Sequence, residues 1–294
     1  MPELLLVSIL WAFSFGLIKS RLAGVDASLV ALVRLALSLL VFLPFLRLRG
    51  VPWRARARLA LVGAVQFGAM YVLYLRAYAY LAAHEVALFT ILTPIYVVLI
   101  DAAKARRLRW AYLGVAAIAT AGAAIVVCAA PHTASPLPGI LLVQGSNLCF
   151  AAGQLVWKWE RARLPAGPSD LRLFALPYAG AVALALLVAG FSADWGSLAR
   201  LSPAQWLTLA YLGCVASGLG FFLWNAGARR VDAGTLAVLN DLKIPLGVGC
   251  SILLFSERAS APKLAASLAL FAAALWLARR GAVSNVSFSG APRK

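Results

Sequence analysis

The sequence predicts an all-α integral membrane protein with ten transmembrane helices, built as two inverted repeats of five helices each. Three observations lead to this fold class. Hydrophobic residues make up 63% of the 294 residues and charged residues only 13%, a composition outside the range of soluble domains. The apolar runs reach the roughly 20 residues that a helix needs to cross a hydrocarbon core of about 30 Å. Segments of the first half also resemble segments of the second.

The apolar runs define the predicted spans and the division of the chain. We expect spans at residues 3–19, 27–46, 58–79, 84–102, 110–129, 138–157, 171–191, 205–227, 233–254 and 262–279. They imply a first repeat at 1–133, a second repeat at 134–281 and a flexible C-terminal tail at 282–294. The connections are too short for a separate soluble domain, so the function lies within the bilayer or at its faces.

The net charge of +17 raises the question of a nucleic-acid partner. The basic residues, however, gather in alternate loops, such as 47–58, 104–109 and 158–172, whereas the loops on the opposite side hold few. By the positive-inside rule this asymmetry predicts that both termini are cytoplasmic. The basicity therefore orients the chain in the membrane, and we expect no nucleic-acid partner.

Cysteine and histidine do not form a metal-binding pattern. Cys128, Cys149, Cys214 and Cys250 fall in predicted spans, and His84 and His132 belong to different outward-facing connections, His84 at the very edge of the span that begins there. None of them shows the spacing of a structural or catalytic metal site. The sequence therefore predicts neither a metal site nor a cofactor.

The two halves match in order. The segment "SILWAFSFGLIK" (8–19) aligns with "NLCFAAGQLVWK" (147–158), and a later match sets Pro94 against Pro245. Since each repeat holds an odd number of spans, the second must cross the membrane in the opposite sense. Inverted repeats are common in secondary transporters, whose substrate site lies near the bilayer midplane between the two copies.

Pro94 and Pro245 mark predicted helix breaks at corresponding positions. A proline in a helix interior supplies no N–H, so the carbonyls of Thr90 and Asp241 are expected to be free of helical hydrogen bonds. Such breaks in both halves are the best sequence indication of a transporter's binding site. Asn240 adds a polar side chain beside the second break.

Lys243 and Asp241 lie close to the centre of the ninth span. A charged side chain there opposes insertion by about 2.5 to 3.5 kcal/mol, so each needs a partner or a water-filled cavity. Residues two apart on a helix do not face each other, and the two cannot simply neutralise one another. A purely structural ion pair that locks helix packing stays open as an alternative.

Further side chains are expected to line a central cavity. Tyr71 and Tyr74 share one helical face, and Asn147 and Gln154 share another. The full candidate set for substrate binding is Lys243, Asp241, Asn240, Trp11, Tyr71, Tyr74, Thr90, Asn147, Gln154, Trp224 and Asn225. For the amide side chains, hydrogen bonding between helices is an equal alternative. Arg34 is expected to pair with Glu85, a contact that could be structural only.

Several motifs carry a family resemblance. They are "LWAFSFG" (10–16), Arg34 in "ALVRLAL", "ILTPIYVVLI" (91–100), "YLGCVASGLGFFLWNAG" (211–227), "LNDLKIP" (239–245) and "LLFSER" (253–258). With these the chain resembles the drug/metabolite transporter (DMT) superfamily, with two EamA-type domains over residues 3–280. The resemblance implies ten helices, cytoplasmic termini and export of small metabolites or amino acids across the bacterial inner membrane. "EVALFTILTP" (85–94) and "WNAG" (224–227) resemble the YddG-type aromatic amino acid exporters.

The sequence thus predicts a secondary transporter of the inner membrane, not an enzyme. Its partners are a small-molecule substrate, most simply an aromatic or other neutral amino acid, and membrane lipid. In the expected mechanism Lys243 binds the carboxylate, Asp241 or Glu85 the ammonium, and the two repeats rock around the site. A multidrug exporter, a sugar- or nucleotide-type exporter and a sensor without flux stay open. An intramembrane serine protease built on Ser217 would lack a histidine base within the spans.

Overall fold

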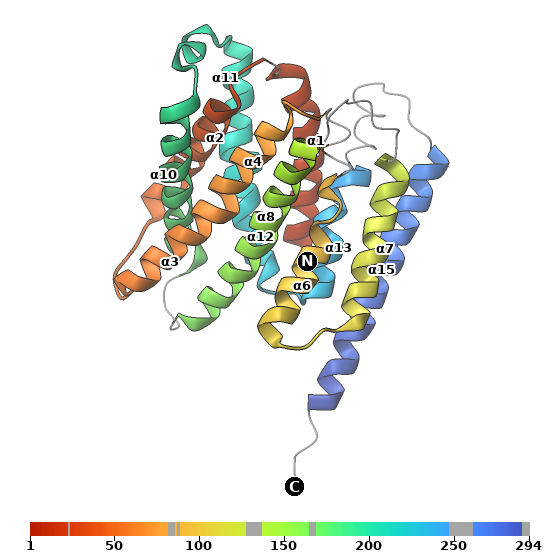
Figure 1. The fold of residues 1–294 in the computed structure, drawn as a ribbon. Coiled ribbons are helices and arrows are strands. Elements are labelled where there is room, and N and C mark those ends of the chain that lie inside the picture. The colour runs from red at the N-terminus through yellow and green to blue at the C-terminus, as the bar shows by residue number, and fades with distance from the viewer. Residues whose placement is uncertain are drawn as a thin grey trace.

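The computed structural model describes residues 1–22, 24–81, 86, 89–127, 137–164, 169–246 and 261–289. Within these ranges the chain is helical and contains no β-strand, as the predicted all-α class requires. The helices pack side by side into a bundle (Figure 1).

The elements follow the chain in two series. The first series is α1 (Pro2–Arg21), α2 (Ala27–Phe42), η1 (Leu43–Phe45), α3 (Trp53–Gly63), η2 (Ala64–Ala69), α4 (Met70–Ala77), α6 (Thr93–Ala105) and α7 (Trp110–Val127). The second series is α8 (Leu137–Arg163), α9 (Asp170–Leu173), α10 (Ala175–Ser192), η3 (Trp195–Arg200), α11 (Pro203–Ala210), η4 (Tyr211–Leu219), α12 (Gly220–Ala228), α13 (Ala233–Asp241) and α15 (Ala261–Ser289).

Six helical segments of the described chain are long and apolar enough to cross a membrane. They are Ala27–Phe45, Trp53–Ala77, Leu137–Arg163, Asp170–Ser192, Pro203–Ala228 and Pro262–Arg280. Two shorter apolar helices, Pro2–Ser14 and Trp110–Ile125, also fall in predicted spans. The spans expected at 84–102 and 233–254 lie partly outside the described residues. The total of ten and the inverted arrangement therefore stay predictions.

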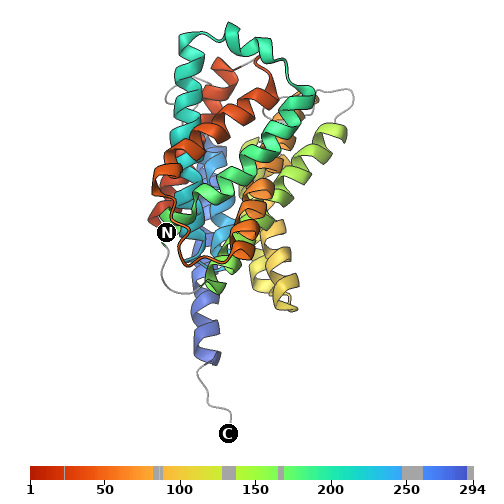
Figure 2. The same cartoon turned by 90° about the vertical axis from the view of Figure 1, so that its left-hand side faces the viewer.

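Two groups of helices form the sides of the bundle. Helices α2, α3 and α10 pack together on one side, and α7 packs along α15 on the other (Figure 1). Turned by 90°, the same bundle shows α15 reaching past its neighbours towards the C-terminus (Figure 2). Helix α8 packs against α3, α4 and α6, and α1 packs against α12. Helix α8 therefore bridges the two sides, through α3 on one side and through α6, which packs against α7, on the other.

Side-chain caps fix where several helices begin. The carboxylate of Asp26 accepts hydrogen bonds from the backbone N–H groups of Ser28 and Leu29, at 2.9 and 3.0 Å, at the start of α2. Asp232 caps α13 in the same way by accepting from the N–H of Thr235 at 2.9 Å. Such caps satisfy N–H groups that have no partner within the helix, and they set the register of the span that follows.

Helices α3 and α10 approach closely through two glycines. A Cβ atom built on Gly63 would lie 1.9 Å from the carbonyl oxygen of Pro177, and one built on Gly180 would lie 1.9 Å from that of Ala60. Small residues allow membrane helices to bring their backbones together, and van der Waals packing then holds them. This contact holds α3 against α10, and α3 is the first part of the long segment that continues into η2 and α4.

Two long spans each contain a stretch of π-helix, η2 at Ala64–Ala69 and η4 at Tyr211–Leu219. A π-helical insertion rotates the residues that follow it and often occurs at functional sites. Tyr71 and Phe221 are each the second residue after such a stretch, and their ring centroids lie 5.9 Å apart. The two insertions thus direct aromatic rings toward the middle of the bundle.

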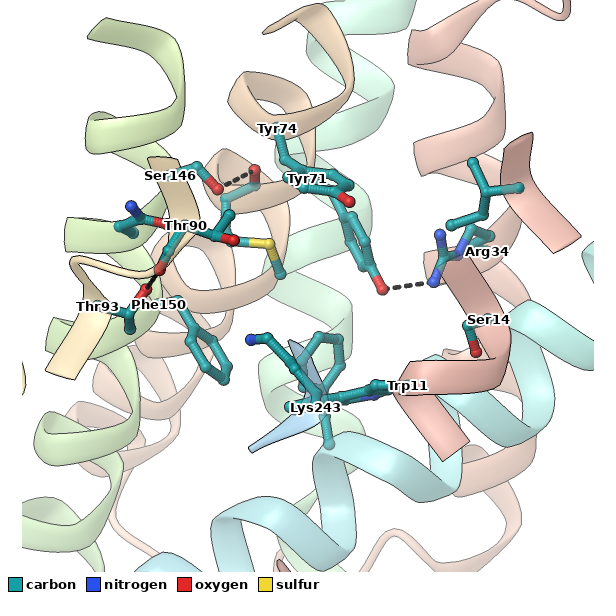
Figure 3. A pocket seen from close by; sticks show the side chains of 14 residues that line it. Trp11, Ser14, Arg34, Tyr71, Tyr74, Thr90, Thr93, Ser146, Phe150 and Lys243 are labelled. Atoms are coloured by element: carbon teal, nitrogen blue, oxygen red, sulfur yellow. Dashed lines mark hydrogen bonds between the residues drawn. The ribbon is translucent and has the colours of Figure 1, made fainter. Parts of the chain in front are cut away.

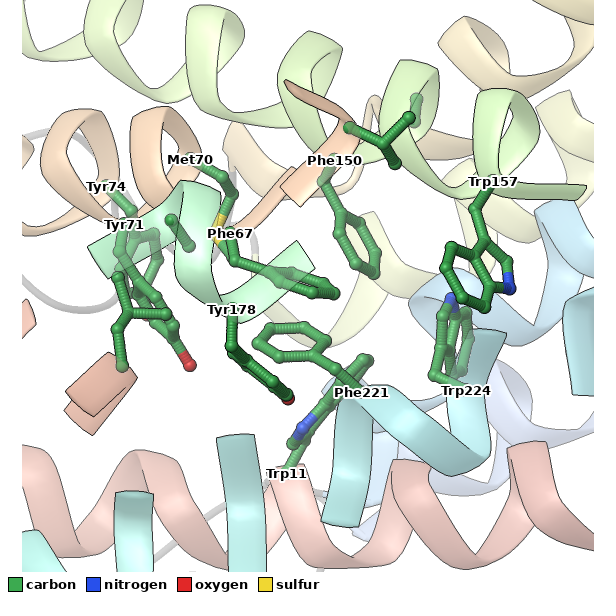
Figure 4. Packing of buried hydrophobic residues seen from close by; sticks show 14 of the residues in the cluster. Trp11, Phe67, Met70, Tyr71, Tyr74, Phe150, Trp157, Tyr178, Phe221 and Trp224 are labelled. Carbon is green, nitrogen blue, oxygen red and sulfur yellow. The ribbon is translucent and has the colours of Figure 1, made fainter. Parts of the chain in front are cut away.

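An aromatic cluster fills this central region (Figure 4). The rings of Phe67 and Phe221 stack at 4.6 Å, and those of Phe67 and Tyr178 stack at 5.1 Å. Trp11 lies 4.9 Å from Trp224. Aromatic rings that pack in this way stabilise one another, so the cluster joins helices from both halves of the chain.

Candidate functional site

A cavity of about 670 Å³, including its open part, lies between helices of both halves (Figure 3). Its polar lining consists of Ser14, Arg34, Thr90, Thr93, Ser146, Asn147 and Lys243. Its apolar and aromatic lining consists of Trp11, Ile18, Met70, Tyr71, Tyr74, Phe150 and Phe221. Like small-molecule pockets in general, the cavity is mostly apolar and carries a few polar groups.

The ammonium group of Lys243 lies between two aromatic walls. Its Nζ is 5.4 Å from the ring centroid of Trp11 and 5.6 Å from that of Phe150 (Figure 3). Ring faces attract cations, so both side chains stabilise the ammonium at the cavity. The indole N–H of Trp11 donates a 2.9 Å hydrogen bond to the carbonyl of Ala216, which fixes the ring. Lys243 thus offers a positive charge in an apolar surrounding.

Arg34 supplies a second cation to the cavity wall. Its side chain is 3% exposed, and its Nη2 donates to the hydroxyl of Tyr71 at 2.6 Å (Figure 3). Nη2 and Nε also donate to the hydroxyl of Ser217, at 3.0 and 3.2 Å. Its Nη1 has no hydrogen-bond partner in the part of the chain that the structure describes. Arg34 is therefore held in place and retains an unused donor.

Two polar side chains, Asn147 of α8 and Thr93 at the start of α6, form hydrogen bonds with the backbone that precedes α6. Asn147 donates from Nδ2 to the carbonyl of Phe89 at 2.8 Å, and Thr93 donates from Oγ1 to the carbonyl of Thr90 at 2.8 Å. Helix α6 begins at Thr93 with Pro94 in its first turn, after two turn residues. Backbone groups outside a regular helix need such partners at membrane depth. These side chains therefore hold irregular backbone beside the cavity.

The second predicted break lies in the same region. Helix α13 ends at Asp241, Leu242 is a turn residue, and helical structure resumes at Lys243 ahead of Pro245. This turn separates the side chain of Asp241 from that of Lys243. Lys243 lines the cavity, whereas Asp241 is fully buried and is not among its lining residues.

The remaining candidates lie in the packing around the cavity. Trp224 donates from its indole N–H to Oε1 of Gln154 at 2.7 Å, and Gln66 donates to Oδ1 of Asn225 at 3.1 Å. Asn240 donates to the carbonyl of Leu236 at 2.9 Å. The Trp224–Gln154 and Gln66–Asn225 bonds join different helices, as the alternative for the amide side chains expects, whereas the bond of Asn240 lies within α13. The structure brings Trp11, Tyr71, Tyr74, Thr90, Asn147 and Lys243 together at the cavity and leaves Asn240, Asp241, Gln154, Trp224 and Asn225 outside its lining.

Some cavity residues were not predicted as binding residues. Phe150 and Arg34 are the most important, and Ser14, Ile18, Met70, Thr93, Ser146 and Phe221 complete the lining. Phe150 aligns with Trp11 in the two matching segments, so the repeat itself carried the signal. Arg34 was visible as an ionisable residue within a span. Its expected partner Glu85 lies outside the described residues, and the contacts of Arg34 go to Tyr71 and Ser217.

Ser217 does not have the environment of an enzymatic nucleophile. The residue is fully buried, and its hydroxyl contacts Arg34 and the hydroxyl of Tyr71, at 2.9 Å from the latter. Activation of a serine requires a base that removes its proton. Arginine is permanently protonated and can only donate. Ser217 instead positions Arg34.

Comparison with known proteins gives consistent matches over nearly the whole chain. Residues 3–128 and 137–279 match the family described as the EamA-like transporter family. A protein of Escherichia coli (strain K12) named "Biotin transporter" is 40% identical over 282 residues, covering 95% of this chain and 93% of that protein. A protein of the same name from Salmonella typhimurium (strain LT2) matches to the same extent. A "Probable biotin transporter" of Pseudomonas aeruginosa (strain PAO1) is 41% identical over 282 residues, covering 96% and 98%.

The fold also resembles a solved structure. A chain titled "Crystal structure of protein" superimposes with a TM-score of 0.75 and covers 94% of this chain and 95% of its own. The two sequences are 22% identical, so this match concerns the fold alone.

Proposed function

This chain belongs to the EamA-like transporter family, and on that premise we propose that it carries biotin, or a closely similar carboxylic acid, across the bacterial inner membrane. The comparisons alone show that the protein is a membrane transporter of small metabolites and not an enzyme. The observation that carries the choice of substrate is 40% identity to proteins named biotin transporter, over 95% of this chain.

The cavity supports a substrate with one negative charge and an apolar body. Lys243 provides an ammonium for a carboxylate, and such a charge-assisted hydrogen bond is about twice as strong as a neutral one. Trp11 and Phe150 beside it pack against the aliphatic chain that carries the carboxylate. No aspartate or glutamate occurs among the described residues that line the cavity. The local charge is therefore positive.

We expect Arg34 to bind the end of biotin that lies opposite its carboxylate. The ureido ring of biotin presents one carbonyl oxygen and two N–H groups. Arg34 lines the cavity and its guanidinium can donate to the carbonyl, and the hydroxyl of Tyr71 beside it can accept from an N–H group. Tyr71 and Phe221 provide flat surfaces for the fused rings. In this arrangement Lys243 and Arg34 bind opposite ends of the substrate.

A neutral amino acid is the second candidate, which the sequence favoured. Its ammonium needs an acidic partner, and the residues expected to provide one were Asp241 and Glu85. Asp241 is buried away from the cavity lining, and Glu85 lies outside the described residues. An ammonium next to Lys243 and Arg34 would also be repelled. The described cavity therefore favours a carboxylate without a second charge.

For the transport cycle we propose alternating access, in which the two halves of the chain rock around the cavity. The π-helical stretches η2 and η4 end two residues before Tyr71 and Phe221 and are suited to absorb such a movement. We place both termini in the cytoplasm, following the distribution of basic loops. Export, which the family resemblance implied, is one direction of this cycle.

Counterflow in proteoliposomes tests the proposal. Vesicles loaded with unlabelled biotin should take up external labelled biotin, and vesicles loaded with phenylalanine, glucose or a hydrophobic cation should not. Biotin amide, which lacks the carboxylate, should compete roughly tenfold less well or worse, because it cannot form the charged hydrogen bond with Lys243. Counterflow of labelled phenylalanine without counterflow of labelled biotin would overturn the proposal in favour of the amino acid.

A further inference from the structure

The carboxylate of Asp241 is buried, and the described residues offer it no hydrogen bond. The residue is 0% exposed, and neither side-chain oxygen has a hydrogen-bond partner in the described part of the chain. It ends α13 at the turn before Lys243. An ionised carboxylate without partners is very unfavourable in a buried site. Such a group becomes neutral by taking up a proton. Neither the cavity lining nor the packing accounts for this acid.

The ammonium of Lys243 and the carboxyl group of Asp241 do not touch, but their charges can still act on each other. Because neither oxygen of Asp241 accepts a hydrogen bond, the ammonium of Lys243 does not touch it. The ammonium instead lies at the aromatic wall of the cavity. In a medium of low polarity two charges act on each other over several ångströms. The protonation of Asp241 and the occupancy of the cavity are therefore coupled.

We propose that Asp241 is the proton-coupling site of this transporter, which takes up one proton when a carboxylate substrate binds Lys243 and releases it when the substrate leaves. This inference rests on the proposed function. The proton comes from the aqueous phase to which the cavity is open and is released to the phase on the other side. No bond to the substrate forms or breaks.

The balance of charge provides the reason for coupling. The described arrangement, in which Lys243 does not touch Asp241, corresponds to protonated Asp241. When the substrate and the proton have left, the ammonium of Lys243 balances the carboxylate of Asp241, and the empty transporter has no net charge. The loaded transporter holds the ammonium, the substrate carboxylate and a protonated Asp241, again with no net charge. Substrate without the proton, or the proton without substrate, leaves one unbalanced charge in the membrane, which is costly. One proton therefore moves together with one carboxylate, and no net charge crosses.

The helices packed against α13 carry other charged groups, and none of those described forms a hydrogen bond with Asp241. On α6, Asp101 acts on Lys158, whose ammonium donates to the carbonyl of Val231 just before α13 begins. On α1, Glu3 pairs with Arg230, also before α13. The exposed basic residues on α15 and at the far end of α1 are Lys263, Arg279, Arg280 and Arg21.

The remaining titratable groups near α13 are tyrosines and one lysine. Tyr112 of α7 lies against Gly234, in the first turn of α13, and Tyr96 of α6 donates from its hydroxyl to Gln144. The side chain of Lys19 on α1 lies outside what the structure describes. Among the described groups, Lys243 is the charged residue that acts on Asp241. The structure describes no cluster of three acidic, histidine or cysteine side chains, so a proton fits this single acid better than a metal ion.

Proton movement in wild-type vesicles tests the inference without a mutation. Purified protein is reconstituted in vesicles filled with the pH-sensitive dye pyranine, and labelled biotin is added outside. The interior should acidify by one proton for each biotin taken up, independently of a potassium diffusion potential. Protein-free vesicles give the contribution of unionised biotin that crosses the lipid unaided, and this is subtracted. Replacing sodium by choline should have no effect.

An Asp241→Asn variant separates exchange from net transport. Asparagine is neutral like protonated Asp241, so the loaded form still crosses, while the empty form carries the unbalanced charge of Lys243. We expect counterflow of biotin to persist and net uptake driven by a pH difference to fall at least about tenfold. Asp101→Asn, a matched change on α6, should leave both unchanged.

The outcomes distinguish the two proposals. Biotin counterflow without proton entry, or net uptake by Asp241→Asn equal to that of the wild type, overturns the coupling role and leaves the proposed function standing. Uptake that requires sodium and moves no proton also overturns it. Absence of biotin counterflow in the wild type overturns the proposed function, and the coupling role with it.

Discussion

Arg34 and Tyr71 contact each other in two ways. The guanidinium donates a 2.6 Å hydrogen bond to the tyrosine hydroxyl, and its Cζ lies 4.5 Å from the centroid of the tyrosine ring. Arginine cannot lose its proton in a protein, so it retains its charge inside the span. The contacts with Tyr71 and Ser217 make this charge tolerable there and orient it toward the cavity.

Removing the hydroxyl of Tyr71 should weaken substrate binding without unfolding the protein. In Tyr71→Phe the ring stays, Ser217 still holds Arg34, and one hydrogen bond to a charged group is lost. Such a bond contributes about 1.5 kcal/mol, so KM for biotin should rise roughly tenfold. Tyr80→Phe removes the same atom from a side chain that is 46% exposed and should have no effect. An unchanged KM in Tyr71→Phe would show that Arg34 does not depend on this contact.

Lys243→Met tests the carboxylate site. Methionine has a similar length and no charge, so the aromatic walls stay filled while the ammonium is lost. Saturable biotin transport should disappear, or KM should rise by at least about tenfold. Lys263→Met, on the exposed face of α15, is the matched control and should transport like the wild type. Normal KM in Lys243→Met would remove this residue from the site.

The sequence predicted the membrane character of the chain and several residues of the cavity for clear physical reasons. Lys243 stood out because a charge at mid-membrane is costly and needs a cavity or a partner. Its separation from Asp241 followed from the helical repeat. The turn at Leu242, which places the lysine at the cavity and leaves the acid buried, depends on backbone geometry that a residue pattern does not reveal.

Other site predictions depended on pairings between helices. Gln154 and Trp224 each carry a polar group that could serve a substrate, but they bind each other at 2.7 Å. The packing of distant segments decides which polar side chains bind one another, so substrate binding and hydrogen bonding between helices were equal alternatives from the residue pattern alone. Arg34 illustrates the same limit, because its contact Ser217 lies 183 residues further along the chain.

The close contact of α3 with α10 should be essential for stability. Gly180→Ala would place a Cβ atom 1.9 Å from the carbonyl oxygen of Ala60, so the helices must separate. Such overpacking costs about 1 to 3 kcal/mol and should lower the thermal unfolding midpoint in detergent by several degrees. Gly190→Ala, in the same helix with no atom within 4 Å of the new Cβ, should keep or raise the midpoint. Equal midpoints for the two variants would contradict this packing.

Cysteine labelling should establish the orientation of the chain. The loop after α6 is rich in basic residues and is expected in the cytoplasm, whereas η3 lies in a connection expected on the outer side. Arg107 and Arg200 are exposed in these two connections. In a background without the native cysteines, a membrane-impermeant maleimide added to intact cells should label Arg200→Cys and not Arg107→Cys, and permeabilised cells should show both. Because positive charge resists translocation, the reverse pattern would mean that the basic loops do not set the topology, and the cytoplasmic placement of both termini would fall.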